Sequence, residues 1–399
     1  MHTLEDLESG ALAGARHVRL THLGLTSFPH QLLDLADTLE ILDLSGNQLT
    51  SLPDELARFS RLRILFASSN LFTELPRALG ACQQLEMVGF KACQIQHVAA
   101  DSLPPQLRWL ILTDNQITQL PASLGQRPRL QKLMLSCNQL QALPDLSGCT
   151  RLELLRIASN CLTALPDSML TLPALAWPAV AGNPMTQKSE LSALAASAQT
   201  AIFYQNLHIH ELLGEGASGH IYRATVRGSQ QALALKVFKA AATSDGTPQS
   251  ELAAGLAAGQ HPHLLTTLAA VHGHPEGKLA MALPLLPTGY VNLAGPPSFA
   301  SCTRDVYAPD AHFSPQTAAR LLDCVRSAIT HLHAHGIVHG DLYAHNILYE
   351  PTTGKALLSD LGAAVLTQDM PTAITQQLQA MEWRAFAILE AEIQARVCT

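Results

Sequence analysis

Residues 39–53 read L-E-I-L-D-L-S-G-N-Q-L-T-S-L-P, and residues 62–76 read L-R-I-L-F-A-S-S-N-L-F-T-E-L-P. Successive copies of this phrase start 22 or 23 residues apart. Further copies start at Leu85, Leu107, Leu130, Leu152 and, shortened, Leu175, and a degenerate first copy runs through Leu20, Leu25, Phe28 and Pro29. Leucines held in one register at a period of about 20 to 29 residues predict a solenoid of stacked coils.

The apolar positions of each copy explain why several coils are needed. Leu39, Leu42 and Leu44 are expected to point inward from a short strand and its approach. A fully buried Leu contributes about 1.5–3 kcal/mol, but one coil alone leaves an apolar face uncovered. Each coil is therefore closed by the next.

Polar and proline positions also recur in register. An Asn follows most strands where the chain turns inward, and a buried amide there satisfies backbone groups that otherwise cost about 1–3 kcal/mol each. These residues are Asn47, Asn70, Asn115, Asn138, Asn160 and Asn183, with Cys93 in that place in the third full copy. Prolines are expected to start the return segment on the outer face, at Pro53, Pro76, Pro121, Pro144 and Pro166.

The pattern L-x-x-L-x-L-x-x-N-x-L closely resembles the leucine-rich repeat family. The resemblance covers residues 1–184, and the Ala- and Ser-rich residues 185–205 are interpreted as a cap and linker. It implies a binding surface for a protein partner on the concave strand face. The residues expected there are Phe66, Met87, Trp109, Ile111, Met134 and Trp177, with Asp43, Lys91, Lys132 and Arg156 around them. The alternative is that these are unconnected surface apolar residues.

Composition excludes several other classes of protein. The chain is 47% hydrophobic and 14% charged, with a net charge of −7, which argues against a nucleic-acid backbone as the main partner. No apolar run approaches the roughly 18 residues of a membrane span. The N-terminus lacks the layout of a secretory signal, and the eight Cys show no C-x-x-C spacing. We therefore expect reduced thiols and a cytoplasmic location.

From Leu207 the periodicity changes to strand-like alternation. The first strand runs into G-E-G-A-S-G at 214–219, and 221–226 and 232–238 are predicted to be the next two strands. A lone G-x-G-x-x-G also occurs in dinucleotide-binding folds, where the glycines open a helix. Here a strand is expected after them instead, and Lys236 lies on the third strand.

This order resembles the N-terminal lobe of protein kinases. The resemblance implies that ATP is held by Gly214, Glu215, Gly216, Ala217, Ser218, Gly219, Ile221, Ala234 and Lys236. Lys236 would hold the α- and β-phosphates, and Glu251, fifteen residues on, would orient it from a helix. Residues 279–286 are expected to form the fifth strand and the start of the hinge, where Pro284 removes one donor.

A helix expected from Ser314 to Gly336 leads to H-G-D-L-Y-A-H-N at 339–346. By the same resemblance, Asp341 orients the attacking hydroxyl, and Asn346 holds a metal ion. Asp360-Leu361-Gly362 matches the family's D-F-G, and its Asp is the principal ligand of Mg²⁺. Lys236, Glu251 and Asp341 are thus the expected catalytic residues, and Asn346 and Asp360 the metal ligands.

The sequence departs from the kinase pattern in three places. Gly340 replaces an Arg that pairs with an activation-loop phosphate, so no activating phosphorylation is expected. Tyr343 replaces a Lys that steadies the γ-phosphate. E-W-R-A-F-A at 382–387 resembles the start of a buried C-terminal-lobe helix, only 22 residues after Asp360, so the last helices and the peptide groove are expected to be missing.

The predicted fold is a leucine-rich repeat solenoid (α/β) followed by a truncated two-lobed protein kinase-like domain (α+β) at 206–399. The predicted function is ATP- and Mg-dependent phosphotransfer, with protein substrates recruited by the solenoid. Two alternatives remain open at this stage. H-G-D also occurs in aminoglycoside and choline kinase-like enzymes, which phosphorylate small molecules, and a pseudokinase scaffold would bind nucleotide without transfer.

Overall fold

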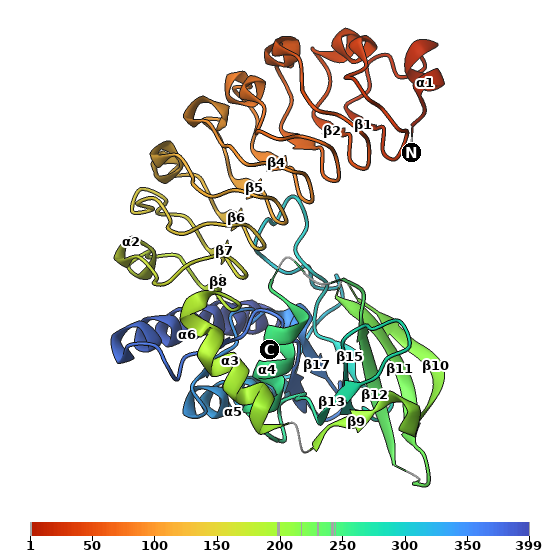
Figure 1. Ribbon diagram of the computed structural model, residues 1–399, viewed down its shortest axis with the longest axis vertical. Coiled ribbons are helices and arrows are strands. Elements are labelled where there is room, and N and C mark those ends of the chain that lie inside the picture. Colours follow the sequence, from red (N-terminus) through yellow and green to blue (C-terminus); the bar gives the residue numbers. More distant parts are fainter. Residues whose placement is uncertain are drawn as a thin grey trace. The chain divides into compact units, whose positions relative to one another are not determined.

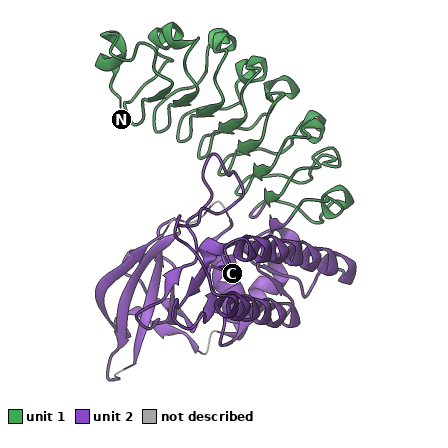
Figure 2. Cartoon of the chain, turned by 180° about the vertical axis from the view of Figure 1, so that it is seen from behind, with its two compact units in different colours: residues 1–156, 160–175 green, residues 157–159, 176–399 purple. Residues whose placement is uncertain are grey.

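The computed structural model describes residues 2–197, 200–216, 218–229, 231–240, 243 and 245–398. The chain divides into two compact units (Figure 2). Unit 1 comprises residues 1–156 and 160–175, and unit 2 comprises residues 157–159 and 176–399. The units therefore divide near residue 176, whereas the sequence placed domain boundaries at 184 and 205.

Unit 1 is the predicted solenoid. Its short parallel strands pair in sequence order, so that Leu42 lies opposite Leu65, and Leu65 opposite Val88 (Figure 1). The central residue of each of these strands is fully buried. The strands are β1 (His17–Arg19), β2 (Ile41–Asp43), β3 (Ile64–Phe66), β4 (Met87–Gly89), β5 (Trp109–Ile111), β6 (Lys132–Met134) and β7 (Leu154–Arg156).

Short helices form the opposite side of the coils. Most of them begin directly after a proline, as at Pro53, Pro76 and Pro121. They are η1 (His30–Leu35), η2 (Asp54–Arg58), η3 (Arg77–Ala81), η4 (Ala100–Ser102), η5 (Ala122–Gln126) and α2 (Asp167–Leu170). Helix α1 (Leu4–Glu8) precedes the first coil and starts with a capping box between Thr3 and Asp6.

The recurrent Asn side chains satisfy backbone groups, as the sequence predicted, and these groups belong to neighbouring coils as well as their own. Nδ2 of Asn70 donates to the carbonyls of Leu44 and Ala67 at 3.0 and 2.9 Å, and its Oδ1 accepts from the Leu49 amide at 2.9 Å. Cys93 has only its thiol in this position, 3.5 Å from the Ala67 carbonyl. The amide ladder therefore satisfies buried backbone groups at each coil where Asn is present.

Unit 2 begins with the last repeat strand, β8 (Trp177–Ala179), and helix α3 (Pro184–Ala196). Ala179 packs with Ala158 and Ala363 in a buried cluster. Segments 157–159 and 176–196 therefore belong to the core of unit 2, although their sequence continues the repeat and its cap.

The N-terminal lobe of unit 2 is a six-stranded sheet in the order β10-β11-β12-β14-β13-β9. Its strands are β9 (Ile202–Phe203), β10 (Leu207–Glu215), β11 (Gly219–Val226), β12 (Ala232–Phe238), β13 (Ala269–His272) and β14 (Ala280–Pro284), and η7 (Tyr204–Asn206) leads into β10. The glycine-rich stretch is followed by strand β11, which excludes the dinucleotide-binding alternative. Helix α4 (Pro248–Ala258) carries Glu251, and its first turn is capped by Thr247.

The remaining part of unit 2 contains two long helices and two small sheets. Helix α5 (Pro315–Ala334) begins at the predicted Ser314 cap, and the chain leaves it at Gly336. Helix α6 (Thr372–Gln394) begins ten residues before Glu382, so the expected helix start at Glu382 is wrong and that residue lies inside the helix. The sheets join β15 (Val291–Asn292), β17 (Ile347–Tyr349) and β18 (Ala356–Leu358), and β16 (Ile337–Val338) with β19 (Val365–Leu366).

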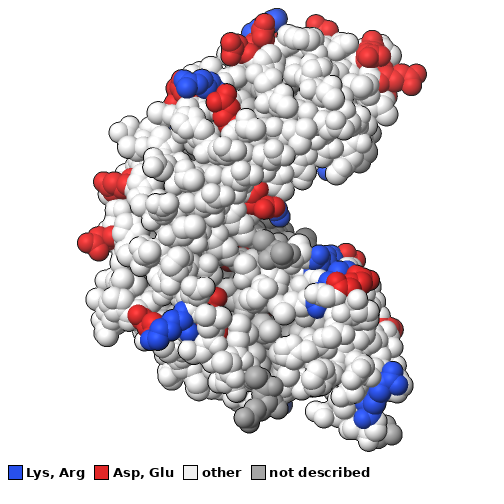
Figure 3. Space-filling view, viewed as in Figure 1, with Lys and Arg blue, Asp and Glu red and all other residues white. Residues whose placement is uncertain are grey.

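Two observations concern the hydrophobicity and the surface charge of the described residues. No helix among them combines the length and the apolar character of a membrane span. On the face drawn in Figure 3, charged side chains stand singly or in small mixed groups, so this part of the described surface offers no extended positive area for a nucleic-acid backbone.

Candidate active site

Lys236 and Glu251 form a buried ion pair at the back of a cleft. Nζ of Lys236 lies 2.5 Å from Oε1 of Glu251, and the two residues are 7% and 4% exposed. Burial lowers the pKa of Lys236, but the carboxylates of Glu251 and Asp360 outweigh this effect and raise the pKa overall. Burial also raises the pKa of Glu251 to about 7, despite the opposing effect of Lys236.

The glycine-rich stretch lies between β10 and β11. The Gly216 amide donates to the Gly219 carbonyl at 2.9 Å, which closes the turn. A Cβ on Gly219 would lie 2.7 Å from the Val237 carbonyl, so only Gly fits against β12, whereas Cβ atoms on Gly214 and Gly216 would point into open space. The backbone on that side is therefore accessible to a ligand.

Three other residues assigned to this turn have different surroundings. Glu215 pairs with Lys239 at 2.6 Å, and this hydrogen bond lowers the pKa of Glu215. The Ser218 carbonyl accepts from the Lys239 amide at 3.1 Å. Ala217 lies outside the described residues. Lys239, which the sequence reasoning missed, also donates to the Gly216 carbonyl at 2.9 Å and so ties the turn to the end of β12.

A cavity of about 240 Å³ lies between the two lobes of unit 2. Its apolar lining comes from Ile221, Leu265, Met281, Leu283, Leu348 and Leu361, and its polar lining includes Lys236, Glu251, Thr267, Asn292, Ser359 and Asp360. Ala234 is buried in the adjoining apolar cluster with Met281 and Leu283. An apolar cavity with charged groups at one end suits a planar base joined to an anionic group.

The H-G-D-L-Y-A-H-N stretch is held in place by hydrogen bonds. Nδ2 of Asn346 donates to Oδ2 of Asp341 at 2.7 Å and to the Asp341 carbonyl at 2.9 Å. The Asp341 amide is 3.2 Å from Nδ1 of buried His339, whose Nε2 is 3.0 Å from the Ser359 carbonyl. The hydroxyl of Ser359 donates to the Asn346 carbonyl at 2.8 Å. This network joins the loop to the residue that precedes Asp360.

Asp360 is exposed and adopts φ of +59°, a left-handed conformation that few residues other than Gly and Asn or Asp occupy readily. Its Oδ1 accepts from the Gly362 amide at 3.0 Å. Strained backbone of this kind is often found at ligand-binding sites. The oxygen donors of Asp360 and Asn346 are those that hard divalent cations prefer, so these residues fit the implied metal.

Gly340 and Glu382 together shape the start of this loop. The Glu382 carboxylate, 1% exposed, accepts from the amides of His339 and Gly340 at 2.6 and 3.1 Å, and lies 2.6 Å from Nε2 of His333. Gly340 has φ of +71°, and a Cβ there would lie 2.5 Å from the Pro178 carbonyl and 2.7 Å from the Ala363 carbonyl. Any side chain at position 340 would therefore clash with β8.

The Tyr343 side chain packs against β8 and is buried. Its ring stacks on Trp177 at 4.2 Å between centroids, and the two residues are 5% and 1% exposed. The prediction that Trp177 belongs to an exposed concave face is therefore wrong, because its indole is buried against the catalytic-loop segment of unit 2.

A second support of the loop was missed by sequence reasoning. Buried Asp305 accepts from the His345 amide at 2.9 Å and lies 2.8 Å from Nδ1 of His345. Burial lowers the pKa of His345, but the hydrogen bond to Asp305 and the nearby carboxylates outweigh it and raise the pKa overall. No local motif marks Asp305, which lies 40 residues before its partner.

The strand face of unit 1 also differs from expectation. Phe66, Trp109, Ile111 and Met134 are half-buried on it, but Met87 is 2% exposed, and the prediction that it is available to a partner is wrong. Ile64 and Trp109 flank Met87 in register and cover it. Arg156, expected at the rim, is also buried.

Five residues of the strand face form three local contacts. Nε1 of Trp109 is 3.4 Å from Sδ of Met134, and Nζ of Lys132 lies 4.2 Å from the Trp109 ring. Phe66 lies over Gly89, where a Cβ would approach the ring to 2.5 Å. The aromatic residues on this face are therefore held in defined positions.

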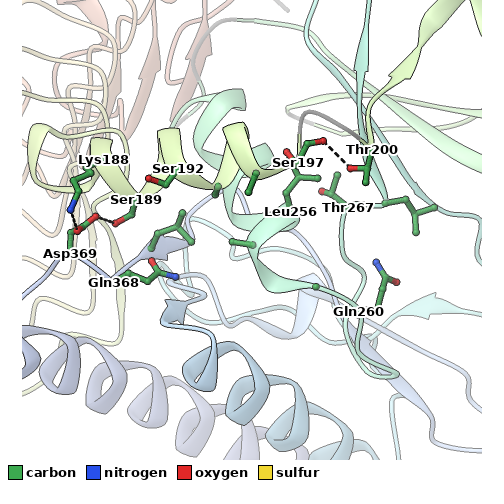
Figure 4. Close-up of a pocket in the computed structure, with 16 residues that line it drawn as sticks. Lys188, Ser189, Ser192, Ser197, Thr200, Leu256, Gln260, Thr267, Gln368 and Asp369 are labelled. Atoms are coloured by element: carbon green, nitrogen blue, oxygen red, sulfur yellow. Dashed lines mark hydrogen bonds and ion pairs between the residues drawn. The ribbon is translucent and has the colours of Figure 1, made fainter.

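A larger hollow of about 720 Å³ lies beside α3 and α4, as drawn in Figure 4. Lys188 and Ser189 point toward Asp369 at one end of it, and Ser197 lies beside Thr200 at the other. Among the residues that the structure describes, none of those assigned to phosphate transfer lines it, and Thr267 alone lines both this hollow and the cleft. The smaller cleft is therefore the candidate site.

This combination of a six-stranded lobe, a Lys–Glu pair and the two Asp-containing segments defines a protein kinase fold. Residues 207–396 match the family described as Protein kinase domain. Residues 105–162 and 38–59 match two families of leucine-rich repeats. The chain thus carries leucine-rich repeats on the N-terminal side of a protein kinase domain.

Curated protein kinases are similar to this chain over its second half. It is 32% identical over 163 residues to the DNA damage-responsive serine/threonine-protein kinase RqkA of Deinococcus radiodurans, covering 39% of this chain and 22% of that protein. It is 25% identical to cyclin-dependent kinase B2-1 of Arabidopsis thaliana, covering 45% and 56%. It is 30% identical to human calcium/calmodulin-dependent protein kinase type 1B, covering 39% and 42%. The chain spans about half or less of the length of these relatives.

Proposed function

We propose that this chain transfers the γ-phosphoryl group of ATP to a protein hydroxyl, using a divalent metal ion, Mg²⁺, and recruiting the protein through its repeats. The observation that carries the proposal is that Lys236, Glu251 and Asp360 line one cleft. The hydrogen-bonded pair Asn346–Asp341 is joined to this cleft through Ser359, which precedes Asp360. The similarity to curated protein kinases supports it.

Each group has a distinct task in this proposal. Lys236, oriented by Glu251, would bind the α- and β-phosphates, and the amides of the turn at 214–219 would face the outer phosphates. Asn346 uses its amide nitrogen on Asp341, so its oxygen is the atom available to a cation, together with the carboxylate of Asp360. The ion, when bound, would offset the negative charge of the phosphates.

Asp341 is the proposed base. Its Oδ2 accepts from Asn346, and its backbone amide donates to His339, so the carboxylate is held in one orientation. It would orient that hydroxyl and take its proton as the oxygen bonds to phosphorus and the bond to ADP breaks. Positioning and charge stabilisation supply most of the rate enhancement in such reactions.

A nucleotide-binding scaffold is a second candidate, and one observation favours it. Tyr343 occupies the position of a cationic residue in many kinases, and its ring is stacked under Trp177, so position 343 supplies no charge to a phosphate. Under this alternative, ATP would bind without transfer.

One assay separates the candidates. The purified chain is incubated with γ-labelled ATP and Mg²⁺, and the products are analysed by mass spectrometry, with Asp341→Asn as the control. Labelled Ser, Thr or Tyr that depends on Asp341 supports protein kinase activity. ATP binding without label supports the scaffold, and label that accumulates only on an added small molecule contradicts both.

A further inference from the structure

The segment that connects the repeats to the kinase domain contacts the elements that carry the proposed catalytic residues. We define this connecting segment as residues 177–196, which comprise β8 and α3. It belongs to unit 2 and contacts three of its parts: the catalytic loop at 339–346, the stretch after Asp360, and helix α4.

The contact with the catalytic loop is made by Trp177. Its Nε1 donates to the Leu342 carbonyl at 2.9 Å, and its ring stacks on Tyr343 with an interplanar angle of 12°. The guanidinium of Arg304 lies 5.2 Å from the same indole ring. Leu342 and Tyr343 directly follow Asp341, so Trp177 restricts the backbone that presents the proposed base.

The next two residues of β8 lie against Gly340 and against the stretch after Asp360. The Pro178 carbonyl occupies the space that a side chain at Gly340 would need. Ala179 packs on Ala363, directly after Asp360-Leu361-Gly362. At the place where an Arg would receive an activation-loop phosphate, this chain thus has a backbone contact with its own repeat strand.

Helix α3 makes the contact with the other lobe through Glu190. One carboxylate oxygen accepts from the Ser250 hydroxyl at 2.9 Å, and the other accepts from the Thr186 hydroxyl at 2.6 Å and the Gly182 amide at 2.8 Å. Glu190 is 9% exposed, and Ser250 immediately precedes Glu251 on α4. Glu190 therefore restrains the helix that carries the partner of Lys236.

The same helix is also fixed to the C-terminal lobe. Nζ of Lys188 and the hydroxyl of Ser189 both lie 2.6 Å from the carboxylate of Asp369, and Figure 4 shows the two side chains converging on it. Asp369 precedes α6. Helix α3 is thus bonded to α4 on one side and to the segment before α6 on the other.

We propose that the connecting segment replaces a phosphorylated activation loop: Trp177 and Glu190 are positioning residues that hold Asp341 and Glu251 in the geometry for transfer. This inference rests on the proposed kinase function and adds a mode of regulation to it. The active arrangement is built into the fold through contacts with the last repeat, and needs no phosphate on residues 360–382.

The first test compares steady-state kinetics of full-length variants. Trp177→Ala should lower kcat by up to about 100-fold, as small misplacements in an active site do. The KM for ATP should stay within about two-fold of wild type, because Trp177 contacts Leu342 and Tyr343 of the catalytic loop, whereas Lys236 and the glycine-rich turn belong to the sheet of the other lobe. Trp177→Phe keeps a stacking ring and should recover most of kcat. Glu190→Ala should instead change both kcat and the KM for ATP, because α4 loses its restraint.

Two controls complete the kinetic test. Leu191→Ala changes an exposed residue beside Glu190 on the same helix and should keep the wild-type constants. Phosphatase-treated wild type should keep its rate. A Trp177→Ala chain with wild-type kcat, or a wild type that loses activity on dephosphorylation and regains it with ATP, overturns the proposal.

A readout without activity separates this inference from the proposed function. Hydrogen exchange of the amides at 339–346 should become faster in Trp177→Ala, while protection of α5 and of unit 1 stays unchanged. A wild type that binds ATP but transfers no phosphate overturns the kinase function and, with it, the catalytic part of the inference. Unchanged exchange in Trp177→Ala overturns the positioning contact itself.

Discussion

At Glu251 the fold sets the proton affinity of a single carboxyl group through burial. The folded state raises the pKa of Glu251 from 4.5 to about 7, so folding binds a proton in that range. The resulting stabilisation is complete below pH 4.5 and is lost as the pH rises through 7. The ion pair with Lys236 has the opposite pH dependence: it forms as the pH rises, since it requires deprotonated Glu251.

The first prediction follows from this opposition. As the pH rises through about 7, kcat/KM for ATP should increase, while the contribution of Glu251 to thermal stability should decrease. Both are measured on the same preparation between about pH 5.5 and about pH 8.5. In Glu251→Gln, activity falls and both pH-dependent steps should disappear. A step near pH 7 that survives in this variant would assign the titration to another group.

The second prediction separates the two Asp residues. Asp341→Asn should reduce transfer by about 100-fold or more, because it removes a proton acceptor needed in the transition state, and should leave ATP binding nearly unchanged. Asp360→Asn should instead weaken metal-dependent ATP binding. Transfer rates and ATP titrations of both variants with and without Mg²⁺ check this. Equal loss of binding in the two variants would contradict the division of roles.

Residue-level prediction from sequence succeeded where spacing along the chain identifies a group. The order Lys236, Glu251 and Asp360 predicted groups that line one cleft, and the spacing of Asp341 and Asn346 predicted two residues that are hydrogen-bonded to each other; their roles stay a prediction. Residues that hold the site in place from distant positions in the sequence could not be found this way, because no fixed spacing marks them. Glu190 meets Ser250 across 60 residues, and Asp305 meets His345 across 40, and neither pair has a motif.

At the scale of elements, the repeat gives a direct comparison between two versions of one position. Nδ2 of Asn138 donates to the carbonyls of Leu112 and Leu135, both at 2.9 Å, and its Oδ1 accepts from the Ile117 amide at 3.0 Å. At the equivalent place Cys93 offers a weak thiol donor. The amide therefore satisfies more buried backbone groups than the thiol does.

The third prediction concerns the stability of unit 1. Asn138→Ala should lower the free energy of unfolding by about 3 kcal/mol or more, since it leaves three buried backbone groups unsatisfied at about 1–3 kcal/mol each. Cys93→Ala, the matched control, should cost about 1 kcal/mol. Urea unfolding monitored by circular dichroism measures both. Similar losses in the two variants would show that the amide contacts add little.

Element boundaries were predicted well where a cap marks them, as at Ser314, and poorly where tertiary contacts decide. Helix α6 starts after Pro371 rather than at Glu382. The contacts of Glu382 with the amides of His339 and Gly340 do not require a helix end, since its side chain makes them from the middle of the helix. Strand β8 continues the repeat in sequence, but Trp177 packs on Tyr343 in unit 2. Only the three-dimensional neighbours of β8 distinguish it from β7.

At the scale of the whole molecule, the chain combines leucine-rich repeats with a protein kinase domain. Leucine-rich repeats generally mediate protein interactions, and the half-buried aromatic residues of unit 1 are the best candidates for this role. Trp109 is held by contacts with Met134 and Lys132, and Phe66 by Gly89. Preorganised aromatic side chains of this kind are typical of binding hot spots.

The fourth prediction tests whether this face selects the substrate. Trp109→Ala should weaken binding of a protein that the wild-type chain captures and phosphorylates by about 2 kcal/mol or more, close to 30-fold in Kd. Transfer to that protein should fall accordingly at limiting concentration, whereas ATP turnover by the chain alone should not change, because Trp109 lies in unit 1 and the cleft in unit 2. Leu71→Ala, an exposed apolar residue of unit 1 outside the strands, is the matched control. If Trp109→Ala and Phe66→Ala both keep every partner at wild-type affinity, recruitment must occur on another surface, and the strand face is then only a packed edge of the solenoid.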